Sequence, residues 1–311
     1  MMQAVLILPG QGAQFEGMGR DWAEAFPVAR ATWEEADRVL GFSLSAACWQ
    51  GGDQVNRTDI AQPGIFTTGV AILRVLEEKG FDRTQVPFAA GLSLGEYTAL
   101  WAAGAMDFAA GLRLVRLRGE AMQAAAESIP SGMTSLMGAT EEQAQSLAEA
   151  GAAHGICQVA NLNAPGQVIV SGELAALDEV ERVAKDHGVR RTRRLVVAGG
   201  FHSECMRPAA EALRKALEAT PLKPAVIPVV SNVTAQPSRD PAQLADQLAT
   251  QVCAPVLWER SMRWIRETGA PSSPLLEPGP GSVLAGLMGK IDPEASVIRM
   301  EKPADMEALP A

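Results

Sequence analysis

Basic residues and cysteines are both scarce in this sequence. Its 311 residues include 27 Lys and Arg against 36 Asp and Glu, for a formal net charge of −9. Nucleic acids and anionic membranes need a basic face, so neither is expected as a partner. The four cysteines are scattered, with no Cys-x-x-Cys pair and no histidine close enough in sequence to complete a zinc site. We therefore expect reduced thiols and no metal site.

Long apolar runs are also missing. Nowhere do 18 apolar residues follow one another, so no membrane-spanning helix is expected. The apolar run at residues 4–8 is short and has no basic region before it, which does not fit a secretion signal. The hydrophobic share of 47% still supplies core for about two compact units. These features predict a folded, cytoplasmic protein and exclude a disordered one.

Predicted strands alternate with predicted helices in the first 130 residues. Residues 4–8 and 86–90 are continuous apolar runs, each followed by a glycine-rich turn, as buried strands are. Residues 70–79 carry apolar side chains at helical spacing, and Asp107 can cap a long helix that follows it. The alternation predicts an α/β fold with a mostly parallel sheet.

The segment of residues 131–198 has a different rhythm. It reads as strand, helix, strand, strand, helix, strand, at residues 133–139, 141–153, 157–161, 168–171, 174–185 and 193–197. An Asn-Ala-Pro-Gly link that begins at Asn163 is a hairpin signal between the middle strands. This β-α-β-β-α-β order predicts a ferredoxin-like subdomain, inserted into a larger, discontinuous domain of residues 1–130 and 199–311.

Ser93 is the strongest candidate nucleophile. It lies in Gly91-Leu92-Ser93-Leu94-Gly95, a Gly-x-Ser-x-Gly motif between a predicted strand and a predicted helix. Flanking glycines allow a strained turn that exposes the hydroxyl, and the N-terminus of the helix offers N–H groups to a developing anion. The alternative is an ordinary glycine-rich turn with a capping serine. The placement of the motif favours the nucleophile.

A nucleophilic serine needs a base, and the chain has three histidines. His154 and His187 each precede a glycine at the end of a predicted helix, where an imidazole complements the helix dipole. His202 follows an apolar run, at a strand or linker end where α/β sheets build their sites. We predict that His202 is the base, with a structural core histidine as the alternative. Only Glu204 offers a nearby acid, so a backbone carbonyl or an amide could orient the ring instead.

Six motifs follow one another along nearly the whole chain: PGQGAQ at 9–14, GLSLGEY at 91–97, RGEAM at 118–122, NLNAPGQ at 161–167, FHS at 201–203 with Met206, and EPGPG at 277–281. Their set resembles that of the malonyl-CoA:acyl carrier protein transacylases, which load malonyl groups for fatty acid synthesis. The resemblance implies an α/β-hydrolase-like domain with a ferredoxin-like insertion, in agreement with the order of predicted strands.

The resemblance also implies catalytic roles. Ser93 would become malonylated, and His202 would activate first this serine and later the incoming thiol. The backbone N–H groups of Gln11 and Leu94 would form the oxyanion hole, which in comparable sites contributes roughly 10²–10³ in rate per donor. The backbone carbonyl of Gln251 would orient the histidine, which would explain the missing acid.

Substrate selection is implied for four further residues. The guanidinium of Arg118 can hold the malonyl carboxylate through two parallel hydrogen bonds. Phe201 resembles the malonyl-selective form of related polyketide acyltransferases, in which bulk excludes an α-methyl branch worth about 1–3 kcal/mol. Leu92 replaces the histidine that the family usually carries before the nucleophile, so polar contacts near the acyl group would differ. Asn163, in the fourth motif, completes the predicted substrate-binding set.

The implied reaction is a two-step ping-pong transfer from malonyl-CoA to the phosphopantetheine thiol of acyl carrier protein. No cofactor is implied, since the CoA thioester is a substrate, and we expect a monomer. Carrier proteins of this kind are acidic, so the basic run at residues 190–194 is a candidate docking patch, with solvated strand-edge charges as the alternative. Arg113 and Arg116, in contrast, are expected to be solvated helix charges.

Four other functions fit parts of the pattern. A standalone polyketide-type or malonate decarboxylase-associated acyltransferase would use the same motifs. A serine hydrolase could use Asp178 or Asp186 as its acid, although both lie in a predicted helix of the inserted segment. A catalytically silent subunit that docks carrier protein is disfavoured by the intact Ser93, His202 and Gln11.

Overall fold

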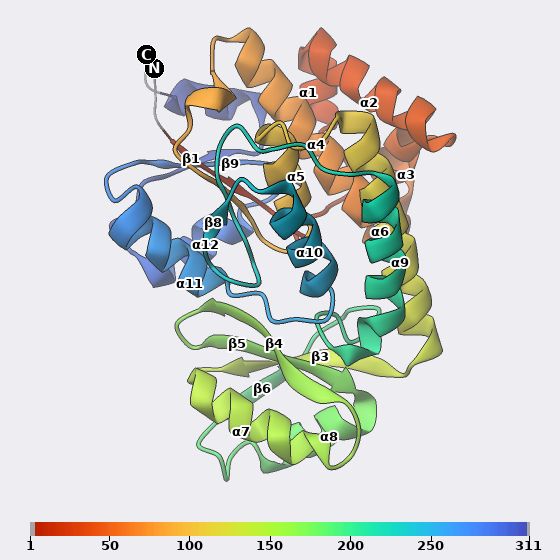
Figure 1. Cartoon of the computed structure of the whole chain (residues 1–311), viewed down its shortest axis with the longest axis vertical. Coiled ribbons are helices and arrows are strands. Elements are labelled where there is room, and N and C mark those ends of the chain that lie inside the picture. Colours follow the sequence, from red (N-terminus) through yellow and green to blue (C-terminus); the bar gives the residue numbers. More distant parts are fainter. Residues whose placement is uncertain (1–3, 310–311) are drawn as a thin grey trace.

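The computed structural model describes residues 4–309, which form two sheets surrounded by helices (Figure 1). The α-helices are α1 (Arg20–Ala25), α2 (Pro27–Leu40), α3 (Leu44–Gln50), α4 (Thr58–Glu78), α5 (Gly95–Ala102), α6 (Phe108–Ser128), α7 (Glu141–Ala152), α8 (Leu174–Val183), α9 (Arg207–Ala219), α10 (Pro241–Gln251), α11 (Trp258–Trp264) and α12 (Val283–Ile291). Shorter helical turns are η1 (Gly52–Asn56), η2 (Arg83–Gln85), η3 (Glu204–Met206), η4 (Ile265–Gly269) and η5 (Pro303–Ala308). None of the helices within residues 4–309 combines the length and the apolar character that a membrane crossing needs.

The larger sheet is mostly parallel, as the sequence predicts. Its strands are β1 (Val5–Leu8), β2 (Ala89–Gly91), β7 (Val229–Val230), β8 (Pro237–Ser238), β9 (Leu275–Pro278) and β10 (Val297–Met300), in the order β10-β9-β1-β2-β7-β8. Only the β7–β8 pair is antiparallel. In β1, Leu6 and Leu8 pack into one hydrophobic cluster and Val5 and Ile7 into another, on the opposite face. Burial on both faces explains why this strand is apolar throughout.

The second sheet is antiparallel and lies below the larger one in Figure 1. It consists of β3 (Ser131–Met137), β4 (Cys157–Ala164), β5 (Gln167–Glu173) and β6 (Arg191–Arg194), in the order β4-β5-β3-β6. Helices α7 and α8 pack on it around a hydrophobic cluster of its own, drawn from residues 136–189. All six elements expected in this segment are present in the expected order.

Two sequence predictions of element boundaries were wrong. The last strand of the second sheet ends at Arg194, and Val196 is fully exposed, because the chain leaves the sheet there for the larger one. Helix α4 begins at Thr58 and not near residue 70. Its first turns contain Gln62 and Pro63, both buried, so the helix is covered on all sides and lacks the amphipathic spacing that marks a surface helix.

The two sheets are joined through the backbone at Val256. The N–H of Val256 donates to the carbonyl of Ala160 (2.9 Å), and its carbonyl accepts from the N–H of Leu162 (2.9 Å). This places the segment that follows α10 along β4. The outer ends of the predicted larger domain, residues 1–3 and 310–311, lie outside the described residues.

Candidate active site

A sharp turn between β2 and α5 presents Ser93, at the carboxyl ends of the neighbouring strands β1 and β2. Ser93 adopts a left-handed backbone conformation, with φ of 52°. A Cβ atom on Gly91 would lie 1.9 Å from the carbonyl carbon of Gly95, and one on Gly95 would lie 2.1 Å from the carbonyl oxygen of Leu8. Both positions therefore require glycine, which is the physical basis of the motif.

His202 meets this serine from a loop that follows the second sheet. Its Nε2 lies 2.8 Å from Ser93 Oγ, and its Nδ1 lies 2.8 Å from the carbonyl oxygen of Gln251. A carbonyl can only accept, so the proton resides on Nδ1 and the lone pair of Nε2 faces the hydroxyl. Burial, together with the positive charge of Arg118, lowers the pKa of His202 to about 4. The imidazole is therefore neutral near pH 7 and able to accept a proton.

Arg118 reaches the same serine from α6. Its side chain is 1% exposed; Nη1 donates to Gln62 Oε1 (2.7 Å), while Nη2 donates to Ser93 Oγ (3.0 Å) and Gln251 Oε1 (3.1 Å). Its Nε has no hydrogen-bond partner among the described residues. A buried cation held by neutral amides attracts a carboxylate ligand strongly.

The other arginines of α6 differ from Arg118. Arg116 forms ion pairs with Asp59 and Glu120, and Arg113 is exposed. Arg113 is therefore a solvated helix charge, as expected, but the same expectation was wrong for Arg116, whose ion pairs hold it partly buried. Of the three arginines, Arg118 is the one that contacts Ser93.

The two candidate oxyanion donors follow β1 and β2. In the part of the chain that the structure describes, neither the N–H of Gln11 nor that of Leu94 donates a hydrogen bond, so both are free to bind an oxyanion. The side chain of Gln11 is held by Gln62, whose Nε2 donates to Gln11 Oε1 (3.2 Å). The same Gln62 thus connects the loop after β1 with Arg118.

The remaining predicted residues vary in their relation to the site. Phe201 is buried beside His202, and Leu92 packs partly buried next to Ser93. Asn163 lies on β4, and its Oδ1 is buried with no hydrogen-bond partner among residues 4–309. No hydrogen bond within the described part of the chain joins it to the other site residues.

Sequence reasoning missed three polar side chains of this site. Asn232 accepts from the N–H of Ser93 (2.6 Å) and donates to the carbonyl of Gly91 (2.6 Å), so it bridges the turn. Gln62 and Glu96 are buried beside Arg118 and Gln251. Asn232 carried a usable signal, since it follows the apolar pair of β7 at the same edge of the sheet.

Two other candidate residues of the sequence, His187 and Asp178, lie away from the serine site. His187 Nδ1 is 2.9 Å from Ser146 Oγ of α7, so its ring contacts a neighbouring helix and not the serine site. Asp178, the alternative triad acid, is a largely exposed residue of α8 that pairs with Arg194. The Nδ1 of His202 faces a backbone carbonyl, so the geometry does not fit the Ser-Asp-His hydrolase alternative.

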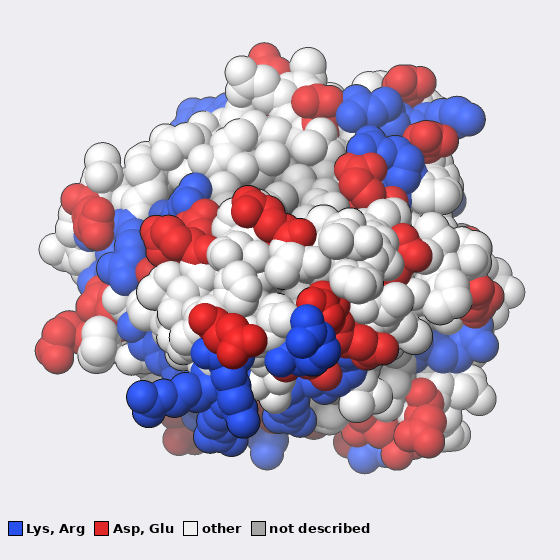
Figure 2. All heavy atoms as spheres, turned by 90° about the horizontal axis from the view of Figure 1, so that it is seen from below, with Lys and Arg blue, Asp and Glu red and all other residues white. Residues whose placement is uncertain are grey.

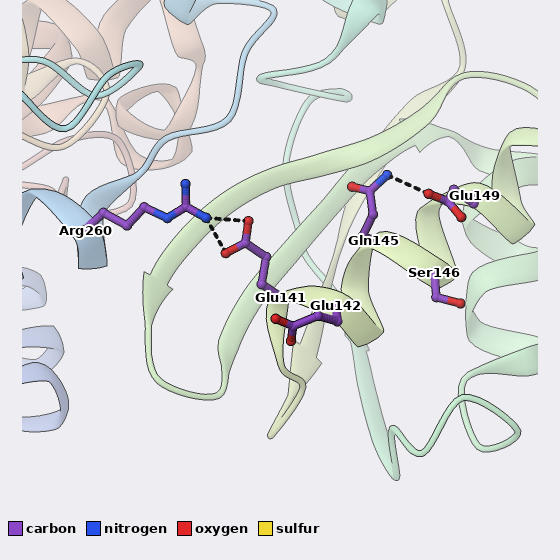
Figure 3. Close-up of a pocket in the computed structure, with 6 residues that line it drawn as sticks. All are labelled: Glu141, Glu142, Gln145, Ser146, Glu149 and Arg260. Atoms are coloured by element: carbon purple, nitrogen blue, oxygen red, sulfur yellow. Dashed lines mark hydrogen bonds and ion pairs between the residues drawn. The ribbon is translucent and has the colours of Figure 1, made fainter.

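A polar pocket of about 450 Å³ opens elsewhere, between α7 and α11 (Figure 3). It is lined by Glu141, Glu142, Gln145, Ser146, Glu149 and Arg260. Two of these residues bind each other, since Arg260 Nη2 donates to both carboxylate oxygens of Glu141. None of the predicted site residues lines this pocket, so it is separate from the serine site.

Comparisons with known proteins identify the family of this chain. Residues 5–273 match the family model described as "Acyl transferase domain", so the chain contains an acyltransferase domain. The malonyl CoA-acyl carrier protein transacylase of Bacillus subtilis (strain 168) is 37% identical over 312 residues, which cover 99% of this chain and 96% of that protein. The chain therefore belongs to the malonyl-CoA:acyl carrier protein transacylase family, and the resemblance stated from its motifs is confirmed.

Solved structures lead to the same family. The crystal structure of an acyl-carrier-protein S-malonyltransferase from Bartonella henselae has a TM-score of 0.94 at 37% identity, covering 99% of this chain and 98% of that chain. A structure described as a type II PKS acyl-carrier protein in complex with its malonyl-transacylase has a TM-score of 0.93 at 36% identity, covering 98% of each chain. The α/β fold with one mostly parallel and one antiparallel sheet is thus shared with these proteins.

Proposed function

We propose that this acyltransferase moves the malonyl group of malonyl-CoA to the phosphopantetheine thiol of acyl carrier protein, a step of fatty acid biosynthesis. The observation that carries the proposal is the buried Arg118 guanidinium, which lies 3.0 Å from Ser93 Oγ and so places a carboxylate-binding cation beside a nucleophile. The names of the relatives agree with this substrate and acceptor. The thioester supplies the activated acyl group, so the proposal needs no cofactor.

In the first half-reaction, His202 Nε2 takes the proton of Ser93 while Oγ attacks the thioester carbonyl. The N–H groups of Gln11 and Leu94 stabilise the oxyanion. When the tetrahedral intermediate collapses, the C–S bond breaks and the imidazolium returns the proton to the CoA sulfur. The product is a malonyl ester of Ser93 and free CoA.

In the second half-reaction, His202 removes the proton of the carrier thiol, and the thiolate attacks the ester carbonyl in the same oxyanion hole. The C–O bond to Ser93 then breaks, and the proton returns to Oγ, which regenerates the enzyme. The carbonyl of Gln251 stabilises the protonated ring in both halves by accepting from Nδ1. Every proton transfer thus passes through Nε2.

Selection of the acyl group is assigned to side chains around Ser93. Arg118 binds the malonyl carboxylate, and Phe201 limits the room for a branch at the α-carbon. Leu92 supplies an apolar wall where relatives use a polar residue, and Asn163 is kept as a substrate-binding residue on the motif resemblance alone. An acyl group without a carboxylate would give Arg118 no direct carboxylate partner beside Ser93, which disfavours acetyl transfer.

We propose that acyl carrier protein docks on the exposed arginines of β6 and on Arg190, which precedes that strand. Arg191 and Arg193 alternate along this edge strand and are exposed, whereas Arg194 is engaged by Asp178 and Glu181. Figure 2, a view from the end that carries the antiparallel sheet, shows Lys and Arg side chains gathered along one edge of this face. An acidic carrier approaching an enzyme of net charge −9 needs such a local basic area.

The docking surface is tested by charge reversal. In the pair Arg191→Glu with Arg193→Glu we expect a several-fold higher KM for carrier protein and unchanged loading of malonyl on Ser93. Reversal of two exposed lysines on other elements, Lys215 and Lys290, is the matched control. A carrier KM equal to that of the control would favour plain solvated charges.

The finer architecture is also a proposal. We infer an α/β-hydrolase-like domain of residues 1–130 and 199–311 with a ferredoxin-like subdomain of residues 131–198. The strand order β4-β5-β3-β6 and the separate hydrophobic cluster of that segment support the division. We further propose that the protein is cytoplasmic and monomeric. Gel filtration with light scattering would test the oligomeric state.

The function is tested by intact-protein mass spectrometry of wild type, Ser93→Ala and Arg118→Ala after mixing with malonyl-CoA or acetyl-CoA. We expect a malonyl adduct on wild type that disappears when acyl carrier protein is added, and no adduct on Ser93→Ala. Arg118→Ala should lose the preference for malonyl over acetyl. If acetyl and malonyl load equally on wild type and on Arg118→Ala, the carboxylate-binding role is wrong. Loss of the adduct to water as fast as to carrier would favour a hydrolase.

A further inference from the structure

The site contains a buried carboxyl group that the reaction above does not use. Glu96, in the first turn of α5, is 0% exposed. Its Oε2 accepts from the N–H of Asn232 (3.1 Å) and from Gln251 Nε2 (2.7 Å). Its Oε1 is buried without a hydrogen-bond partner in the described part of the chain. A carboxyl group so enclosed is costly to keep charged, and its charge state matters to its neighbours.

A single amide joins Glu96 to the substrate-binding arginine. Gln251 donates through Nε2 to Glu96 and to the carbonyl of Ser93 (3.1 Å), and its Oε1 accepts from Arg118. Glu96 is therefore one amide away from Arg118, and the same residue, Gln251, holds His202 through its backbone carbonyl. The geometry makes Glu96 a positioning residue, which acts on the site through Gln251.

The charges that face Glu96 are few. Among the described residues Arg118, from α6, is the cation that acts on it. Tyr97 of α5 and His202 of the neighbouring loop are titratable but neutral near pH 7, because burial raises the pKa of the phenol and lowers that of the imidazole. The buried site thus holds one cation, Arg118, and one acid, Glu96.

A second acid enters this site with the substrate, if the proposed function is right. Two carboxylates and one guanidinium would leave a buried negative charge without a partner, which is unfavourable. We propose that Glu96 takes up a proton when the malonyl carboxylate binds Arg118, so that the site holds one carboxylate at a time. The orphaned Oε1 of Glu96 is the position where the proton would reside.

The acidity of Glu96 fits this exchange. Burial raises its pKa to about 7, even though its hydrogen bonds and the charge of Arg118 act in the opposite direction. A substrate carboxylate that neutralises Arg118 removes part of that opposition and raises the pKa further. Below pH 7 the free enzyme already carries the proton, and malonyl-CoA binds without uptake. Above pH 7 binding requires uptake, so affinity falls with rising pH by up to about tenfold per pH unit.

The experiment is isothermal titration calorimetry of Ser93→Ala, which binds without turnover, at pH 7.5 in phosphate and in Tris. The two buffers differ in ionisation enthalpy, so the difference in heat counts the protons taken up. Binding of malonyl-CoA should be accompanied by the uptake of a substantial fraction of one proton more than binding of acetyl-CoA. Acetyl-CoA shares every group of malonyl-CoA except the carboxylate. Adding Glu96→Gln should abolish that excess, and adding Glu78→Gln, on the exposed end of α4, should preserve it.

Equal uptake for both ligands, or an excess that persists in Glu96→Gln, would overturn the proposal. If Glu96→Gln does not fold, the test is the affinity of Ser93→Ala for malonyl-CoA and for acetyl-CoA, measured from pH 6 to 8.5. A ratio of the two affinities that does not change with pH rejects the exchange. Failure of the proposed function is recognised separately, because wild type would then form no malonyl ester with malonyl-CoA.

Discussion

His202 combines a reacting nitrogen with an environment that keeps the ring neutral. Burial and the charge of Arg118 lower its pKa to about 4, so the base form persists as the pH falls below the ordinary histidine value. We therefore expect kcat/KM for malonyl-CoA, which reports the free enzyme, to hold from pH 7 to about 5 and to fall only below that. Initial rates between pH 4 and 8 measure this, with activity after return to pH 7 as the control for unfolding. An acid limb near 6.5 would contradict the expectation.

Asn232 supports the nucleophile through two short hydrogen bonds. Asn232→Ala leaves the buried N–H of Ser93 without an acceptor, so we expect the free energy of unfolding to drop by about 1–3 kcal/mol. The displaced hydroxyl should slow malonyl loading by roughly 10- to 100-fold. Urea denaturation and single-turnover mass spectrometry give the two values, with the exposed Asn56→Ala as the control. Equal behaviour of the two variants would remove the bridging role.

Residues with distinctive chemistry were predictable from the sequence, and those with generic chemistry were not. Ser93 and His202 were found through a motif and through elimination among three histidines, and they lie 2.8 Å apart. Their functional roles stay predictions until tested. Asn232 and Gln62 are amides, which occur in every part of a protein, and only the folded chain brings them to the site. Their importance comes from partners distant in sequence, which no local pattern contains.

At the scale of elements, Glu277 closes the N-terminus of α12. Its two carboxylate oxygens accept from the N–H groups of Leu284 (3.0 Å) and Ala285 (2.9 Å), whereas the side chain of Ser282, the residue before the helix, makes no capping bond. Glu277→Ala should lower the free energy of unfolding by about 1–3 kcal/mol, because two helix N–H groups lose their acceptors. Ser282→Ala, the matched control, should have almost no effect. Equal midpoints in thermal unfolding would contradict the capping role.

Element prediction succeeded where burial is one-sided or where turns are marked. Helices α7 and α8 each expose one face, and Gly and Pro residues flank the strands between them, so this segment was predicted in the right order. Helix α4 failed at its start because most of its side chains are buried, including polar ones. A pattern of period 3.6 needs a polar face to become visible.

At the scale of the whole molecule, two contacts connect the antiparallel sheet and its helices with the rest of the protein. One is a surface ion pair, and the other is the pair of backbone hydrogen bonds at Val256. Arg260 of α11 binds Glu141 of α7 at the surface (Figure 3), with both side chains about half exposed. Such pairs contribute little, so Glu141→Gln and Arg260→Gln should each change the free energy of unfolding by less than about 1 kcal/mol. A double-mutant cycle in low and high salt measures the coupling. A coupling of several kcal/mol would contradict this expectation.

Long-range order was the least predictable property. The sequence indicates which strands are buried, but the order β10-β9-β1-β2-β7-β8 pairs segments from opposite ends of the chain, such as Val5 with Leu275. Strands as short as β7 and β8 carry almost no periodic signal of their own. The rhythm of the inserted segment predicted that residues 1–130 and 199–311 form one discontinuous domain, but it did not predict the order of the strands in the larger sheet.

The base of this site is oriented by a main-chain oxygen, that of Gln251. Every amino acid supplies such an oxygen, so no missense mutation at this position can delete the acceptor. Alanine scanning would therefore report the loss of the side-chain amide of Gln251 but could not report the contribution of its backbone carbonyl. Only a change to the peptide bond itself, such as an amide-to-ester exchange at Val252, would weaken it. The group that orients the histidine thus cannot be removed by a single amino-acid substitution, whereas an orienting aspartate side chain can.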